Sequence, residues 1–172
     1  MNLKTLLFFA IISLFAIACN NPETPQTPNT TEISEIPPEA PVYDSLKAKE
    51  YGADDYGMRK YVMAFLKKGP NRDLPKEEAA ALQSAHMENI GKLAEAGKLA
   101  LAGPFFGDGD LRGIYIFSVE SLEEAEALTN TDPAIQAGSL VMELKEWYGS
   151  AAVMAINDIH TTLQKQDVTG GE

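Results

Sequence analysis

The sequence YVMAFL at residues 61–66 is followed at once by KKGP at residues 67–70. The first stretch is rich in residues that favour β-strands, and the lysine pair with Gly and Pro ends it. Both of its alternating faces are apolar: Tyr61, Met63 and Phe65 lie on one face, and Val62, Ala64 and Leu66 on the other. A strand with two apolar faces must be covered on both sides. We therefore expect other parts of the protein to pack against both faces of its sheet.

A helix is predicted directly after this strand. Pro75 and the acids that follow it are typical of a helix start, and Gly97 of a helix end. Leu82, His86 and Ile90 recur at the spacing of one helix face. Two further strands are predicted at residues 99–102 and 113–119, and the sequence GDGD at residues 107–110 is typical of the loop of a β-hairpin.

The second half repeats the helix-then-strand order. Ser121 and Glu124 have the spacing of a capping box and predict the start of a second helix. A turn at Asp132-Pro133 precedes a fourth strand, about residues 139–148, and a last helical pattern covers residues 151–163. The order βαββαβ with a C-terminal helix predicts an α+β, ferredoxin-like fold. Two helices cover only one face of such a sheet, so we expect a homodimer in which a second copy covers the other face. The C-terminal helix is the alternative cover, and a partial one.

The N-terminus has the layout of a secretory signal. Lys4 precedes an apolar run at residues 6–17 that is too short to span a membrane, and small Ala16 and Ala18 precede Cys19. The segment resembles a bacterial lipoprotein signal peptide. The resemblance implies removal of residues 1–18 and lipidation of Cys19, the only cysteine in the chain. An ordinary secretory signal with an incidental cysteine is the alternative.

A tether and one domain are expected after Cys19. Residues 19–42 are rich in proline and poor in large apolar side chains, which predicts a disordered linker. Residues 43–164 then form one globular domain, and residues 165–172 a disordered tail. Asn20 beside the anchor favours the outer membrane of a Gram-negative cell envelope, with the domain in the periplasm or at the surface.

Charge and motifs exclude several classes of function. The net charge of −11 and the lack of clustered Lys and Arg argue against nucleic-acid binding. GDGD lies between two strands, so it is no dinucleotide fingerprint, and the residues after it do not continue a calcium loop. The sequence has no conventional zinc motif, so we expect neither a metal nor a cofactor.

Several of these features occur together in one known family. Their order along the chain is QSAH at residues 83–86, the segment from Gly97 to Pro104, GIYIF at residues 113–117, the capped helix from Ser121, and Asp132-Pro133. In this order residues 58–148 resemble the YCII-related family of dimeric α/β-barrel proteins. The resemblance implies that His86 and Asp132 form an active-site pair.

Such a pair has a chemical rationale of its own. An aspartate that accepts a hydrogen bond from one imidazole nitrogen fixes the tautomer and makes the other nitrogen more basic. His86 could then transfer protons beside a carbonyl in an isomerisation or elimination. His86 also lies on an apolar helix face, where a buried structural histidine is the alternative, and Asp132 has a second role as an acceptor at the turn before Pro133. Two functions remain open: a cofactor-free acid/base enzyme, or a non-catalytic envelope module that binds a small ligand or a protein.

Overall fold

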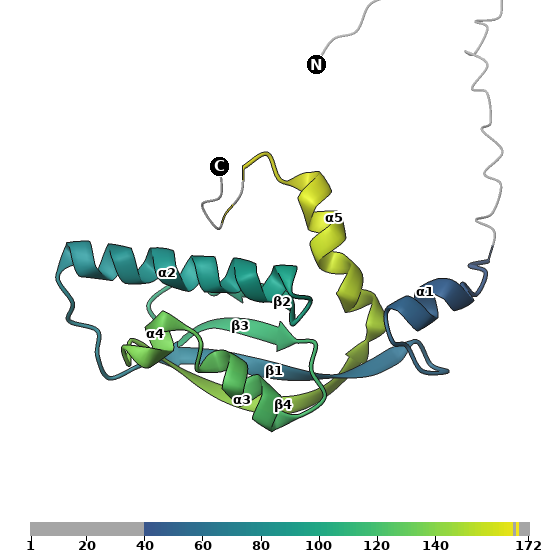
Figure 1. The fold of residues 1–172 in the computed structure, drawn as a ribbon, viewed down its shortest axis with the longest axis horizontal. Coiled ribbons are helices and arrows are strands. Elements are labelled where there is room, and N and C mark those ends of the chain that lie inside the picture. Colours follow the sequence, from purple (N-terminus) through teal and green to yellow (C-terminus); the bar gives the residue numbers. More distant parts are fainter. Residues whose placement is uncertain (1–39, 167, 169–172) are drawn as a thin grey trace, which may run out of the picture. The chain divides into compact units, whose positions relative to one another are not determined.

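A computed structural model describes residues 40–166 and residue 168, so Cys19, its leader and most of the linker lie outside the described residues. The helices and strands follow in the order α1 Ser45–Glu50, β1 Met58–Lys68, α2 Lys76–Glu95, β2 Leu99–Pro104, β3 Leu111–Phe117, α3 Leu122–Thr129, α4 Pro133–Gln136, β4 Leu140–Ser150, the 3₁₀ helix η1 Ala151–Ala155 and α5 Ile156–Leu163 (Figure 1). Within this part of the chain, no helix combines the length and the apolar character that crossing a bilayer requires.

The four strands form one antiparallel sheet in the order β2-β3-β1-β4. With α2 and α3 between its strands, this is the ferredoxin-like topology that the sequence predicts. β1 lies inside the sheet, paired with β3 on one side and along its whole length with β4 on the other. Its two apolar faces therefore belong to two different packing layers.

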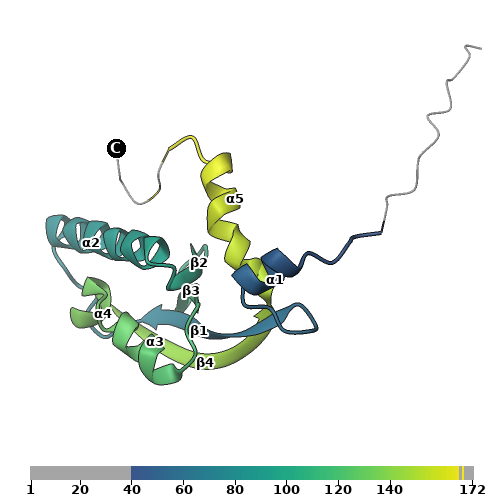
Figure 2. The same ribbon diagram turned by 45° about the vertical axis from the view of Figure 1, so that its right-hand side comes forward.

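The first layer lies between the sheet and the helices. Figure 2 shows α2, α3 and α4 gathered on one face of the sheet. Buried residues from this face and from all three helices make one core, which contains Val62, Ala64, Leu66, Leu93, Leu99, Tyr115, Phe117, Val119, Ala125, Ala134 and Leu140. His86 lies on the buried side of α2, beside Leu82 and Ile90, which pack against this core.

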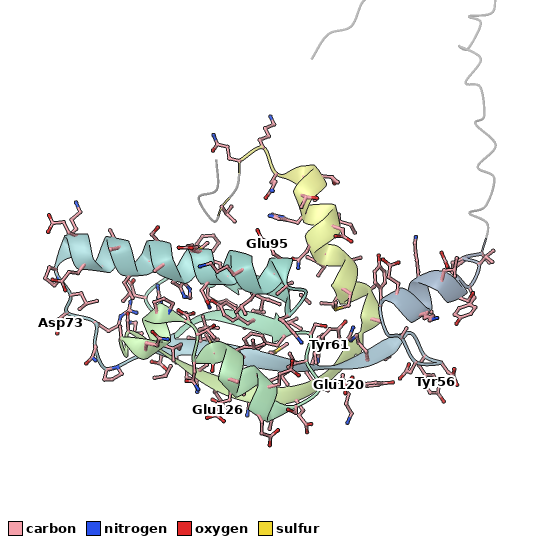
Figure 3. All side chains as sticks on the ribbon, in the orientation of Figure 1. Tyr56, Tyr61, Asp73, Glu95, Glu120 and Glu126 are labelled. Atoms are coloured by element: carbon pink, nitrogen blue, oxygen red, sulfur yellow. The ribbon has the colours of Figure 1, made fainter. Side chains whose placement is uncertain are left out.

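The second layer, on the opposite face of the sheet, is smaller. Tyr61, Ala100 and Ile116 are buried there. Val153 and Met154 of the C-terminal segment, which consists of η1 and α5, pack against them. The Tyr61 side chain lies near the point where this segment leaves β4 (Figure 3). On the same face of β1, Phe65 is only partly buried. The C-terminal segment thus covers part of this face, as the sequence allows.

The structure corrects three details of the sequence-based assignment. The residues after Asp132 form the short helix α4 rather than a simple turn, because Pro133 occupies its first position and Asp132 caps it. The last helical pattern begins as the 3₁₀ helix η1 and becomes α-helical only from Ile156. The helix α1, capped by Asp44, has no counterpart in the prediction.

Candidate active site

Asp132 is fixed by the backbone around it. It is the N-cap of α4, and its Oδ1 accepts a hydrogen bond of 2.8 Å from the N–H of Ala134. Pro133 has no N–H group, so Ala134 offers the first free donor of the helix. The Asp132 N–H in turn donates to the carbonyl of Thr129, the last residue of α3. One carboxylate oxygen is thereby committed to the fold, and the other is free for a side-chain partner.

That partner is His86. The Nδ1 of His86 lies 2.8 Å from Oδ2 of Asp132. Asp132 is 0% exposed and His86 8% exposed, so the hydrogen bond is shielded from water. Because a carboxylate can only accept, Nδ1 carries the proton and Nε2 keeps its lone pair in the neutral ring. The expected contact between His86 and Asp132 is therefore present. Asp132 also accepts a backbone hydrogen bond after the turn, and it uses a different carboxylate oxygen for each of the two hydrogen bonds.

The free nitrogen of His86 faces a third polar side chain. The hydroxyl of Tyr115 lies 3.4 Å from Nε2, and the Tyr115 ring packs edge-on against Phe117, with 5.7 Å between the ring centroids. Tyr115 is 2% exposed. Burial, and secondly the negative charge of Asp132, raise the pKa of the Tyr115 phenol well above its usual value. Tyr115 therefore stays protonated and can donate a hydrogen bond.

These groups border a pocket of about 550 Å³. His86 and Tyr115 line it, whereas Asp132 does not, so Asp132 lies behind His86 as seen from the cavity. Leu66, Leu82, Ile90 and Leu140 contribute apolar lining. Gln83, Ser139, Arg72 and Arg112 add polar groups. The pocket therefore combines an apolar lining with the imidazole of His86, the hydroxyl of Tyr115 and two guanidinium groups.

A close contact between two glycines sets part of the pocket lining. The N–H of Gly69 donates to the carbonyl of Ser139, and the N–H of Asn71 donates to that of Gly138. A Cβ atom at Gly69 would lie 2.1 Å from the Gly138 carbonyl oxygen, so no other residue fits there. Gly138 has a φ of 69°, which other residues rarely adopt. This contact brings the loop that carries Arg72 against Ser139.

Of His86, Asp132 and Tyr115, the first two are identifiable from the sequence. His86 and Asp132 lie together as expected, while Cys19 lies outside the described residues. The sequence pattern indicates Tyr115 only as part of a strand. Tyr115 lies on the same face of its strand as Gly113 and Phe117, and this face points to the helices. A buried tyrosine hydroxyl usually requires a polar partner, so a tyrosine at this position could have indicated a polar site.

Comparison with known proteins assigns the chain to a family. The sequence pattern of the YCII-related domain matches residues 60–148, just over half of the chain, and the chain therefore belongs to the YCII-related family. The uncharacterized protein YjpA of Bacillus subtilis is 33% identical over 64 residues, which cover 37% of this chain and 73% of that protein. A solved structure of 5-chloro-2-hydroxyhydroquinone dehydrochlorinase from Burkholderia phenoliruptrix, in complex with 2,5-dihydroxybenzoquinone, is 22% identical with a TM-score of 0.39; the match covers 52% of this chain and 93% of that one.

The raised pKa of Tyr115 predicts a loss of stability at alkaline pH. Between the unfolded pKa of about 10 and the higher folded value, the unfolded state has released this proton and the folded state has not. The stabilisation is therefore complete below about pH 10 and is lost above it, by up to about 1.4 kcal/mol per pH unit. Urea unfolding of wild type and Tyr115→Phe from pH 8 upward measures this, with exposed Tyr56→Phe as the control. We expect the Tyr115→Phe curve to be the flatter one above pH 10, and parallel curves would contradict the assignment.

Proposed function

We propose that this protein is a small acid/base enzyme that works without a cofactor, with His86 as the proton-transferring group. The observation that supports the proposal best is the buried hydrogen bond of 2.8 Å between His86 and Asp132 at the wall of a pocket. Asp132 orients the imidazole and stabilises the imidazolium that forms when Nε2 takes a proton. The substrate is a small molecule with an acidic C–H group beside a carbonyl.

The proposed reaction begins when Nε2 of His86 removes the proton next to the carbonyl. The electron pair of that C–H bond moves onto the carbonyl oxygen, and the Tyr115 hydroxyl donates a hydrogen bond to the oxyanion. In an isomerisation, the carbonyl re-forms as His86 returns the proton to a different carbon. In an elimination, the carbonyl re-forms, a carbon–carbon double bond forms as the leaving group departs from the neighbouring carbon with its bonding electron pair, and His86 gives its proton to the leaving group or to water. Both outcomes use the same residues, so the class of reaction depends on the substrate.

Solvent-deuterium exchange tests this proposal before a substrate is known. Residues 20–172 are incubated in D₂O with a panel of small 2-oxo acids and 1,3-diketones, and proton NMR follows the loss of the signal beside each carbonyl. We expect enzyme-dependent exchange with a subset of the panel. Both His86→Asn and Asp132→Asn should slow it by about a hundredfold or more. His160→Asn, which changes the other histidine of the chain, should catalyse the exchange at the wild-type rate.

Melting temperatures of the same variants separate catalysis from structure. If His86→Asn retains its melting temperature and loses exchange, His86 acts in the chemistry. If no member of the panel exchanges and both variants unfold at much lower temperatures, the pair is structural and the protein is a non-catalytic binding module of the cell envelope.

The lipid anchor belongs to the same proposal. The apolar run before Cys19 and the proline-rich linker after it support a protein held at the envelope by acyl chains, most simply on the outer membrane of a Gram-negative cell. Residues 1–18 are then removed, residues 19–42 form the tether, and the domain works in the periplasm or at the surface. Metabolic labelling with a fatty-acid probe should mark the wild type and not Cys19→Ser. Equal labelling of the two would contradict the anchor.

A homodimer completes the proposal. Apolar side chains lie partly open on the sheet face opposite α2, α3 and α4. Phe65 of β1, which lies opposite Ile114 of β3, is only partly buried, and Val141 is 43% exposed. A second copy packed on this face would remove these side chains from water. Residues 20–172 should sediment as a dimer at micromolar concentration, and Ile114→Glu as a monomer. The control is Leu122→Glu, an exposed apolar residue of α3 on the helix side. Wild type that remains monomeric at micromolar concentrations would contradict the dimer and leave the C-terminal segment to cover this face of the sheet.

A further inference from the structure

The charged side chains that line the pocket are basic, whereas the net charge of the protein is negative. The chain has 25 acidic and 14 basic side chains, yet no aspartate or glutamate occurs among the described residues that line the pocket. Two of the three arginines in the chain, Arg72 and Arg112, do line it. Asp73, Glu95, Glu120 and Glu126, which are labelled in Figure 3, are exposed, and none of them lines the pocket.

Neither arginine forms an ion pair within the described part of the chain. The Nη1 group of Arg72 donates a hydrogen bond of 3.0 Å to the carbonyl of Ser139. The Nη1 group of Arg112 donates a hydrogen bond of 2.6 Å to the carbonyl of Gly107. Each guanidinium has five N–H donors, and the hydrogen bonds to described residues use Nη1 alone. The remaining donors can bind a ligand.

We infer that the ligand of this pocket is a small carboxylate with an apolar body, bound through Arg72 and Arg112. This inference rests on the proposed function, because it puts the ligand beside His86. The planar fork of a guanidinium matches the two oxygens of a carboxylate, and such charge-assisted hydrogen bonds are about twice as strong as neutral ones. The leucine and isoleucine side chains in the lining take the apolar body, and the volume of about 550 Å³ accommodates a compound of this size.

Binding of the carboxylate would also orient the substrate for the proposed reaction. A carboxylate held by arginines orients the substrate before any proton moves, so that its reacting carbon can be presented to Nε2 of His86. The carboxylate of Asp132 does not line the pocket, and both of its oxygens are already hydrogen-bonded, to His86 and to Ala134. Asp132 therefore stays behind His86, and the arginines are the charged groups that meet the ligand.

Two matched probe compounds test the inference without the natural substrate. Hydrocinnamate and hydrocinnamamide share an apolar body and differ in their charge, and each is titrated into residues 20–172. The imidazole NMR signals of His86 and His160 report binding, because His86 lines this pocket and His160 does not. We expect the carboxylate to shift the His86 signal with a dissociation constant about tenfold lower than that of the amide. The His160 signal should stay in place.

Variants assign the effect to the arginines. Arg72→Gln and Arg112→Gln should each weaken hydrocinnamate binding about tenfold and leave hydrocinnamamide binding unchanged, which also shows that the variant pocket is folded. Lys92→Gln removes the same charge from the exposed side of α2 and should change neither. Phenylphosphonate provides a second anion. Tighter binding of phenylphosphonate than of hydrocinnamate, equal binding of the carboxylate and the amide, or an arginine variant with unchanged carboxylate affinity would overturn the inference.

The failure of this inference is distinguishable from failure of the proposed function. Deuterium exchange on neutral 1,3-diketones that depends on His86, without any preference for carboxylates, would leave the enzyme and remove the carboxylate ligand. Selective carboxylate binding that depends on Arg72 and Arg112, without exchange on any compound, would leave the ligand class and remove the catalysis.

Discussion

The structure of the site depends on one buried carboxylate with two partners. Asp132 caps α4 through one oxygen and holds His86 through the other, both at 2.8 Å. A buried carboxylate without such partners would be costly, and a residue without a donor in place of His86 would leave one Asp132 oxygen unpaired in the interior. The geometry therefore joins α2, the end of α3 and the start of α4 at one point. It also leaves only one orientation for the imidazole, with Nε2 toward Tyr115 and the pocket.

The sheet separates two tasks. Its helix-side face carries the main core and, beside it, the pocket with His86 and Tyr115. Its other face carries a smaller cluster that the C-terminal segment covers only in part. In the proposed function the first face binds and transforms a small anion, the second pairs with another copy, and the lipidated tether keeps the assembly at the envelope. These tasks occupy different surfaces, so loss of one need not abolish the others.

Much of this architecture is predictable from periodicity because strand and helix faces repeat at fixed spacings. The apolar alternation at Tyr61–Leu66 and the stripe through His86 predict the sheet and α2, and Asp132-Pro133 predicts a turn at which Asp132 accepts a hydrogen bond. The helix after Pro133 follows from the Asp132 cap and Pro133, which apolar periodicity does not report, and the 3₁₀ segment from Ala151 packs against the sheet through Val153 and Met154. Tyr115, Arg72 and Arg112 come from separate segments, and only the folded chain shows that they share a pocket. No spacing rule joins residues so far apart in sequence.

The protonation of the His86 ring tests most directly whether Asp132 orients a base toward the pocket. Long-range proton–nitrogen NMR correlation distinguishes the two nitrogens of a neutral imidazole, and His86→Asn identifies the signals. We predict a proton on Nδ1 and a free lone pair on Nε2, and a change of this tautomer preference in Asp132→Asn. A proton on Nε2 in the wild type, or a ring that is indifferent to Asp132→Asn, would contradict an aspartate-oriented base facing the pocket.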